Sequence, residues 1–166
     1  MRVPYRKPGK YSQIKSDPIL TEGKFTELKN KLNRLKNLSQ PRAIEEVKRL
    51  AELGDFSENV EYQIAKGRLR GINDSILKIE NQLKHAVIIT PQKQIETVQI
   101  GHKVTVQSDN KARTYQILGS SETNPHKGII SYNSPIGAAL IGRKVGDVVK
   151  TKVDHNEVAY KIIRIE

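Results

Sequence analysis

An uninterrupted heptad pattern is the feature that most restricts how this chain can fold. Between residues 62 and 86, apolar residues recur at alternating intervals of three and four positions, which is typical of a coiled coil. The members of this seam are Tyr62, Ala65, Leu69, Ile72, Ile76, Ile79, Leu83 and Ala86. Two packed helices bury one such seam only, so a helical rod of this kind has to project from a second folded part.

The partner helix is predicted upstream, beginning at Thr21. Its apolar positions step by three and four, slip near residue 40 and then resume, and they are Phe25, Leu28, Leu32, Leu35, Ile44, Val47 and Ala51. Pro41 removes a backbone donor, so we expect a kink or a short break there. The short link from Gly54 to about Ser57 makes the two helices antiparallel neighbours. Arms of about 30 residues predict a rod about 45 Å long.

The second half of the chain has a different pattern, in which short β-rich segments alternate with turn residues. These segments are Val87–Ile89, Ile100–Val106, Tyr115–Leu118, Gly128–Tyr132, Val148–Val153 and Val158–Ile165. One short helix is predicted at Ser134–Ile141, with Pro135 at its first position. The fold class is therefore α+β: an N-terminal antiparallel α-helical coiled-coil hairpin, then a small antiparallel β-sheet domain with one short helix.

The expected organisation has four parts. Residues 1–18 form a basic flexible extension, 19–89 the coiled coil, 90–97 a linker and 98–166 the sheet domain. The extension combines basic residues with three prolines, and it is either a solubilising tail or an auxiliary nucleic-acid contact.

Composition narrows the classes of function. The formal net charge of +11 favours a nucleic acid, an acidic protein surface or a ribonucleoprotein machine as the partner. The absence of Cys excludes disulfides and thiolate metal sites, and the four His are too scattered to form a metal-ligand cluster. Neither a transmembrane run, a secretory signal, a P-loop nor a nucleophile elbow is present, so we expect a soluble cytoplasmic protein.

Two carboxylates, Asp55 and Glu58, mark the turn at the end of the predicted rod. Their spacing fits a capping box, in which Asp55 caps the second helix and Glu58 reaches back to it. It also fits an incomplete Mg²⁺ site, whose remaining ligands another macromolecule would supply, although spacing by itself favours the cap. Phe56 between them is an apolar residue at an exposed tip, where a docking partner would account for it. Spacing alone leaves both interpretations open.

Three cations follow on the second arm at Lys66, Arg68 and Arg70. Lys66 is about 12 Å along the helix from Glu58, so a phosphate backbone lying there would be near both the acids and the cations. The alternative is an ordinary solvated charged face.

These residues resemble the Gre family of bacterial transcript-cleavage factors. The run from Gly54 to Tyr62, with Asp55, Phe56, Ser57, Glu58 and Asn59, is similar to the family's tip motif. Leu20, Thr21 and Gly23 resemble its first-helix start, and the run from Ser134 to Gly142 with Gly146 and Asp147 resembles its C-terminal signature. The family likeness spans residues 20 to about 165. The long basic extension, and Gly67 and Gly71 within the second helix, depart from the family pattern.

The resemblance implies a C-terminal domain similar to FKBP proteins and a defined activity. Such a factor docks at the secondary channel of bacterial RNA polymerase, inserts its coiled coil and stimulates hydrolysis of the 3′ end of backtracked nascent RNA. It does not act as an enzyme alone, because the catalytic centre belongs to the polymerase. By position, Asp55 and Glu58 would hold a Mg²⁺ ion shared with the polymerase, with Phe56, Ser57 and Asn59 as tip support and Lys66, Arg68 and Arg70 as RNA contacts. We expect a monomer without membrane contact.

Two binding functions without chemistry stay open beside this one. A Gre-like inhibitor would plug the same channel, although such a protein is expected to alter the tip acids. A coiled-coil chaperone or prolyl isomerase would need an aromatic pocket, yet residues 91–166 contain only three aromatic residues, Tyr115, Tyr132 and Tyr160.

Overall fold

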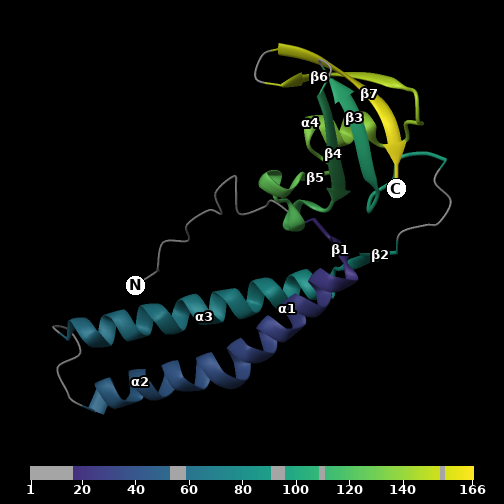
Figure 1. Ribbon diagram of the computed structural model, residues 1–166. Coiled ribbons are helices and arrows are strands. Elements are labelled where there is room, and N and C mark those ends of the chain that lie inside the picture. The colour runs from purple at the N-terminus through teal and green to yellow at the C-terminus, as the bar shows by residue number, and fades with distance from the viewer. Residues whose placement is uncertain (1–16, 53–58, 91–95, 109–110, 154–155) are drawn as a thin grey trace, which may run out of the picture.

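The protein consists of a long helix pair that projects from a β-sheet domain (Figure 1). The computed structural model describes residues 17–52, 59–90, 96–108, 111–153 and 156–166. The first arm contains α1 (Glu22–Arg34), a π-helical turn η2 (Leu35–Ser39) and α2 (Gln40–Glu52), and the second arm is α3 (Val60–Lys84). At about 1.5 Å per residue, α3 is about 37 Å long. The ends of α2 and α3 that face each other across residues 53–59 lie far from the sheet domain (Figure 1).

The first arm bends where the sequence predicts a kink. Pro41 has no N–H to donate into the preceding turn, and that turn widens into the π-helix η2. The Gln40 N–H donates to the Leu35 carbonyl, five residues back, which is the π-helical pattern. This wide turn lets the arm bend without ending the helix, and the predicted kink is confirmed.

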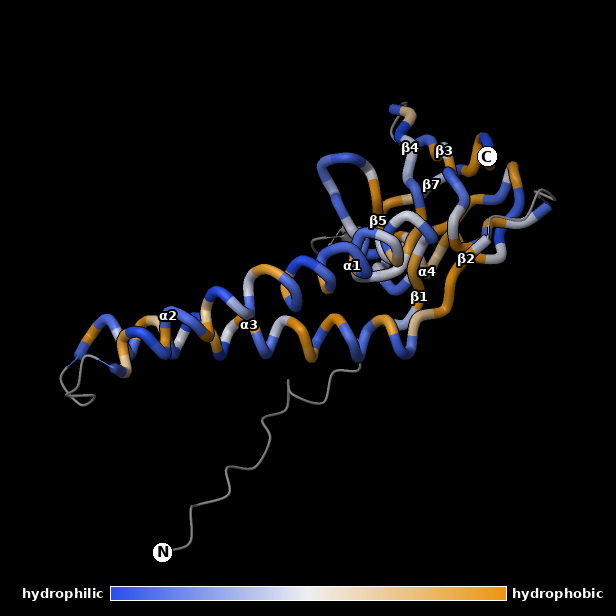
Figure 2. The backbone as a smooth tube through the Cα atoms, turned by 90° about the horizontal axis from the view of Figure 1, so that it is seen from below, coloured by the Kyte–Doolittle hydropathy of each residue, from blue (hydrophilic) through white to orange (hydrophobic). Residues whose placement is uncertain are grey.

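The predicted seam faces the first arm. Ala65, Ile76 and Ile79 are buried, and the other members of the heptad are at least half-buried. Opposite them, Leu28, Ala43 and Leu50 are buried on the first arm. Figure 2 shows hydrophobic stretches recurring along α3 between hydrophilic ones. Apolar burial of this kind supplies most of the stability of a helix pair in water.

Polar contacts between the arms fix how they are paired. Gln40 Nε2 donates to Asn73 Oδ1 at 2.8 Å, and this bond is partly buried within the seam. Ion pairs between Lys36 and Glu80 and between Arg68 and Glu46 flank it. Such exposed ion pairs contribute about 0–1 kcal/mol each, so the apolar seam dominates the stability.

A two-stranded parallel ribbon closes the base of the rod. It pairs β1 (Ile19–Thr21) with β2 (Val87–Ile89), with Leu20 opposite Ile88. Leu20 is fully buried in a cluster with Leu28 and Ile79. The strand at Val87–Ile89 was predicted, but β1 was not, because its residues were assigned to the start of the coiled coil.

The sheet domain has five strands in the order β5-β4-β3-β7-β6. They are β3 (Lys103–Ser108), β4 (Lys111–Leu118), β5 (Ile129–Ser131), β6 (Val148–Val153) and β7 (Asn156–Ile165). Three of the four pairings are antiparallel, but β5 pairs with β4 in parallel. The prediction of an antiparallel sheet is therefore wrong for this pair, and the sheet is mixed. The cause is the long connection through η3 (Ser120–Glu122) and η4 (Pro125–Lys127), which returns the chain to run beside β4.

One face of the sheet packs on the short helix α4 (Pro135–Leu140). Val104, Val106, Ile117 and Ile162 belong to one buried cluster with Leu140. Ser134 caps α4 by accepting from the Gly137 N–H at 3.1 Å, and Pro135 occupies the first turn as predicted. The likeness of this domain to FKBP proteins stays a prediction.

His102 is the buried polar side chain of this domain, with 2% of its surface exposed. Its Nδ1 accepts from the Gln99 N–H at 3.3 Å, so the neutral ring carries its proton on Nε2. Nε2 has no partner within the described residues.

A search of the helices in the described part of the chain found none with the length and hydropathy of a membrane span.

Replacing Ile76 with Asp tests the seam. Ile76 is 6% exposed, so an unpaired carboxylate there should cost roughly 4 kcal/mol or more and unfold the helix pair. The neighbouring Leu77 is 63% exposed, and Leu77→Asp should cost only about 0.5 kcal/mol. Circular dichroism should show helix loss in the first variant alone while the sheet domain stays folded. Simultaneous loss of helix and sheet would show that the two parts do not fold separately.

The two glycines within α3 offer a second test. A Cβ added at Gly67 or Gly71 would meet no atom within 4 Å, so nothing inside the described fold requires glycine there. Ala at each position should raise the free energy of unfolding by about 1 kcal/mol. Gly137→Ala is the contrasting variant, because its Cβ would lie 2.1 Å from the Ser131 carbonyl oxygen and should destabilise α4. Thermal melting of the three variants checks both signs.

Candidate functional site

The candidate site lies where α2 and α3 meet, at the far end of the rod. The predicted tip residues Asp55, Phe56, Ser57 and Glu58 fall outside the described residues, so their placement stays a prediction. The structure does describe what flanks them. Helix α2 ends at Glu52, and α3 begins at Val60. The predicted link from Gly54 to about Ser57 lies outside the described residues.

Asn59 caps α3. Its backbone is extended, with φ −79° and ψ 94°, and its side chain accepts from the Tyr62 N–H at 3.0 Å. The Asn59 carbonyl accepts from the Gln63 N–H at 3.2 Å, which closes the first turn. Asn is among the preferred N-cap residues, and this spacing is the usual one.

This cap corrects one of the two interpretations of the tip acids. The capping-box hypothesis placed Asp55 at the helix start, four positions before the residue that holds that place. It is wrong because an Asn directly before the helix supplies the cap instead. The start of α3 therefore uses neither Asp55 nor Glu58 as its N-cap. A local signal for this existed, since Asn59 precedes the apolar Val60 as an N-cap residue would.

The three predicted cations on α3 do not share one face. At about 100° per residue, Lys66 and Arg70 are separated by about 40°, while Arg68 is about 200° from Lys66. All three are exposed. Arg68 Nη1 bonds Glu46 Oε2 on the first arm at 2.9 Å, whereas Lys66 Nζ lies 5.7 Å from the centre of the Tyr62 ring. Lys66 and Arg70 thus form an outward pair, and Arg68 is tied to the neighbouring helix.

The start of α3 is electropositive. Between Val60 and Gly71 the sequence holds these three cations and one acid, Glu61. The exposed positive side chains are suited to binding a polyanion and not a metal cation. No group of three or more His, Asp or Glu side chains in the described ranges could hold a metal ion.

An apolar stripe on the outward face of α3 was missed by the sequence analysis. Val60 and Ile64 are 69% and 59% exposed, and Gly67 and Gly71 continue the same line at helical spacing. We call these four residues the outer stripe. The sequence did carry a signal for this stripe, because Val60, Ile64, Gly67 and Gly71 recur at intervals of four and three. The stronger heptad pattern of the seam obscured it. The glycines leave this side of the rod narrow.

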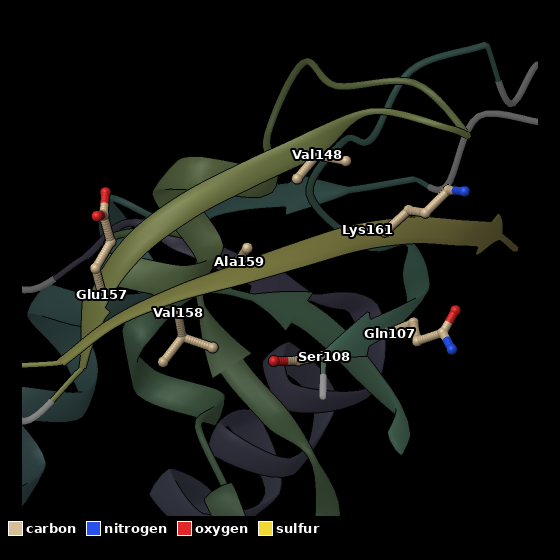
Figure 3. Close-up of a pocket in the computed structure, with 7 residues that line it drawn as sticks. All are labelled: Gln107, Ser108, Val148, Glu157, Val158, Ala159 and Lys161. Atoms are coloured by element: carbon tan, nitrogen blue, oxygen red, sulfur yellow. The ribbon is translucent and has the colours of Figure 1, made fainter. Parts of the chain in front are cut away.

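A hollow of about 540 Å³ lies on the sheet domain, between the ends of β3, β6 and β7 (Figure 3). Its described lining includes one acid and one base, Glu157 and Lys161, with Val148, Val158 and Ala159 between them. Besides the Ser108 hydroxyl, this lining holds a single carboxylate and no His, so it has neither the acid pair nor the Ser–His arrangement used for hydrolysis. No aromatic side chain lines it either, so it does not resemble a peptide pocket for prolyl isomerisation.

Comparison with known proteins covers both parts of the chain. The family model described as "Transcription elongation factor, N-terminal" matches residues 18–88, and "Transcription elongation factor, GreA/GreB, C-term" matches residues 92–166. The chain is similar to Transcription elongation factor GreA of Macrococcus caseolyticus, with 41% identity over 91% of this chain and 97% of that protein. It is also similar to GreA of Geobacillus kaustophilus, with 36% identity over 92% of this chain and 98% of that protein.

Among solved structures, the Gfh1 protein of Thermus thermophilus, a "GreA factor homolog", aligns over 90% of this chain and 99% of that chain. The identity is 24% and the TM-score 0.42, which is too low to support a functional conclusion. The sequence matches span both domains at identities well above that level. On them, the chain belongs to the GreA/GreB family of transcription elongation factors.

Proposed function

We propose that this elongation factor binds bacterial RNA polymerase and stimulates Mg²⁺-dependent cleavage of the 3′ end of backtracked RNA. The observation that carries the proposal is the Asn59 cap at the far end of a projecting rod. Because Asn59 satisfies the helix start, the nearby carboxylates of Asp55 and Glu58 are not needed there. Two acids in a turn without a capping role are suited to a metal ion that a partner also binds.

The two domains divide the work. The sheet domain docks on the polymerase outside the secondary channel, and the helix pair enters it. The length of α3, about 37 Å, lets groups at its far end act at a distance from the docking surface. The outer stripe, with Gly67 and Gly71, keeps one side of the rod slim where it passes the channel wall.

Asp55 and Glu58 are the residues that would hold the shared Mg²⁺, and their oxygen donors fit the preference of that ion. When bound, the ion supplies an activated water and stabilises the leaving oxygen. The chain's own residues position these acids: Asn59 fixes where α3 begins, while Phe56 and Ser57 support the turn against its surroundings. The protein alone has too few ligands for tight binding, so it acts only with the polymerase.

Lys66 and Arg70 are proposed to hold the phosphate backbone of the RNA. Their shared outward direction suits one strand lying along α3. Arg68 is bonded to Glu46 and contributes less to this contact. Backbone contacts of this kind carry no sequence information, so the factor would act on transcripts of any sequence.

The alternatives without chemistry have less support. An inhibitor that only plugs the channel has no use for two tip acids, and both are present. A prolyl isomerase needs an aromatic pocket, but Tyr160 is buried in the core and Tyr115 and Tyr132 pack against that core. We propose that the factor acts as a cytoplasmic monomer.

The double variant Asp55→Asn, Glu58→Gln tests the proposed chemistry. Both changes keep size and polarity but remove the anionic ligands, so polymerase binding and melting should be retained while RNA cleavage falls by at least about tenfold. Asp74→Asn is the matched control, because Asp74 is an exposed acid on α3 away from the tip. Cleavage is measured with a stalled, backtracked polymerase, and excess Mn²⁺ should partly restore it.

Three results would count against the proposal. Wild-type cleavage by the double variant would remove the two acids from the mechanism. Binding without any cleavage by the unmodified protein would favour the inhibitor. Loss of polymerase binding in the double variant would assign the acids to docking instead of chemistry.

The double variant Lys66→Ala, Arg70→Ala tests the RNA contact. Loss of two phosphate contacts should weaken cross-linking to the RNA 3′ segment. It should also make the slope of log K for RNA binding against log salt concentration shallower by about 1.4, at about 0.7 for each contact to a single strand. Arg68→Ala should have a smaller effect, and Lys78→Ala, farther along α3, serves as the neutral control. Equal effects of all these changes would show that Lys66 and Arg70 contribute only general surface charge and no specific RNA contact.

A further inference from the structure

Two carboxylates join the helix pair to the sheet domain, one contributed from each side. Asp17 precedes β1 at the base of the rod, and Glu122 ends the 3₁₀ turn η3 of the sheet domain. Each accepts hydrogen bonds from the opposite part, across more than 100 positions of sequence. We call these two residues with their partners the carboxylate clasp.

Glu122 holds the residue at which the rod begins. Its Oε2 accepts from the Thr21 N–H at 2.8 Å, and its Oε1 accepts from the Thr21 hydroxyl at 2.6 Å. The same hydroxyl accepts from the Lys24 N–H at 3.2 Å and thereby caps α1. The bidentate contact therefore fixes the position and the direction of the first turn of the rod.

Asp17 makes the reciprocal contact. Its Oδ2 accepts from the Ser120 N–H at 2.7 Å, while Oδ1 accepts from the Ile19 N–H at 3.0 Å and the Tyr132 hydroxyl at 3.3 Å. Burial alone would raise the pKa of Asp17, but the hydrogen bonds from Ser120, Ile19 and Tyr132 outweigh it and lower that pKa. The carboxylate is thus held in its charged form, in which it accepts all three bonds.

The backbones also touch at the clasp. Gly119 is buried, and a Cβ added to it would lie 2.2 Å from the Ile19 carbonyl oxygen. Only glycine allows β1 to approach this closely. On the second arm, Gln82 Nε2 donates to Ser121 Oγ at 3.0 Å, so α3 is tied to the same turn of the sheet domain.

The leverage of the rod makes this junction important. A tilt of about 10° at the base moves the far end of a helix about 37 Å long by about 6 Å. Misplacement of reacting groups by about 1 Å can reduce a rate by about 100-fold. The angle between the two domains must therefore be held much more tightly than a flexible linker would hold it.

We propose that Asp17 and Glu122 are positioning residues, which fix the angle of the rod and through it aim Asp55 and Glu58 at the reacting phosphate. The aiming of Asp55 and Glu58 rests on the proposed cleavage function, whereas the control of the angle between the rod and the sheet domain does not. The clasp acts through Thr21 at the start of the rod and through Ser120 and Tyr132 on the sheet domain, so its loss leaves the tip acids chemically unchanged.

Distance measurements test the angle in the full-length protein. The chain has no Cys, so spin labels can be placed at Lys78→Cys on α3 and Lys150→Cys on β6 without background. The double variant Asp17→Ala, Glu122→Ala removes the oxygen acceptors that hold the N–H groups of Ser120 and Thr21, and it leaves the Thr21 hydroxyl able to cap α1. The interdomain distance distribution should become clearly broader, with unchanged circular dichroism. Glu157→Gln, an exposed acid elsewhere on the sheet domain, should leave it narrow.

Cleavage assays test the aiming. The clasp variant should bind polymerase within about twofold of the unmodified protein and cleave backtracked RNA at least about tenfold more slowly. A second variant adds Gln82→Cys and Ser121→Cys, whose side chains meet in the structure, bridged by a short bifunctional thiol reagent. In the chain without the two spin-label sites, this bridge should restore cleavage, which a merely destabilised protein would not show.

The outcomes separate the two claims. An unchanged distance distribution in the clasp variant would overturn the control of the angle, whatever the protein does to RNA. A broadened distribution with full cleavage would overturn the aiming role. If the unmodified protein fails to stimulate cleavage, the proposed function and the aiming role fall together, and the distance distributions still decide whether the clasp sets the angle.

Discussion

The apolar seam between α3 and the first arm is the interaction on which the rest of the structure depends. Two helices alone bury only one face each, so this pair needs an uninterrupted contact along its whole length and a firm base. Ala65 and Ile76 provide the contact along the rod, and Leu20 completes the cluster around Leu28 and Ile79 at the base. Because β1 supplies Leu20 and leads directly into the clasp, the packing that holds the arms together also joins them to the sheet domain.

Sequence patterns predicted those parts of the fold whose cause is local. The heptad run fixes α3, Pro41 fixes the bend, and Ser134 with Pro135 fixes the start of α4. The parallel pairing of β5 with β4 depends on where a long connection returns in space, which no short-range period encodes. The strand β1 and the clasp depend on Asp17 and Glu122 meeting across 105 positions, and their isolated carboxylates carry no signal in the sequence.

The sequence identified the residues of the candidate site better than it predicted how they are arranged. The family resemblance marks Asp55 and Glu58, and the position of the helix cap removes Asp55 as the N-cap of α3, while the metal role stays a proposal. That cap belongs to Asn59, one residue before α3, although the capping-box spacing pointed to Asp55. The three cations were found by composition, but their division into an outward pair and the Glu46-bound Arg68 depends on the neighbouring helix. In the proposed function, one end of the molecule is anchored on the polymerase, and the acids that act on the RNA are carried at the other end.

The bond between Gln40 and Asn73 has a consequence for how such a rod can evolve. This polar pair beside the apolar seam forms in one alignment of the arms only, since sliding either helix would separate the two partly buried amides. A single inserted residue in one arm is therefore not absorbed by slippage but rotates every later seam position away from its partner. The reach of the rod can change only when both arms gain or lose matching numbers of whole turns. We therefore expect the two arms to change length together. Two relatives whose rods differ in length should differ by compensating insertions on either side of the tip.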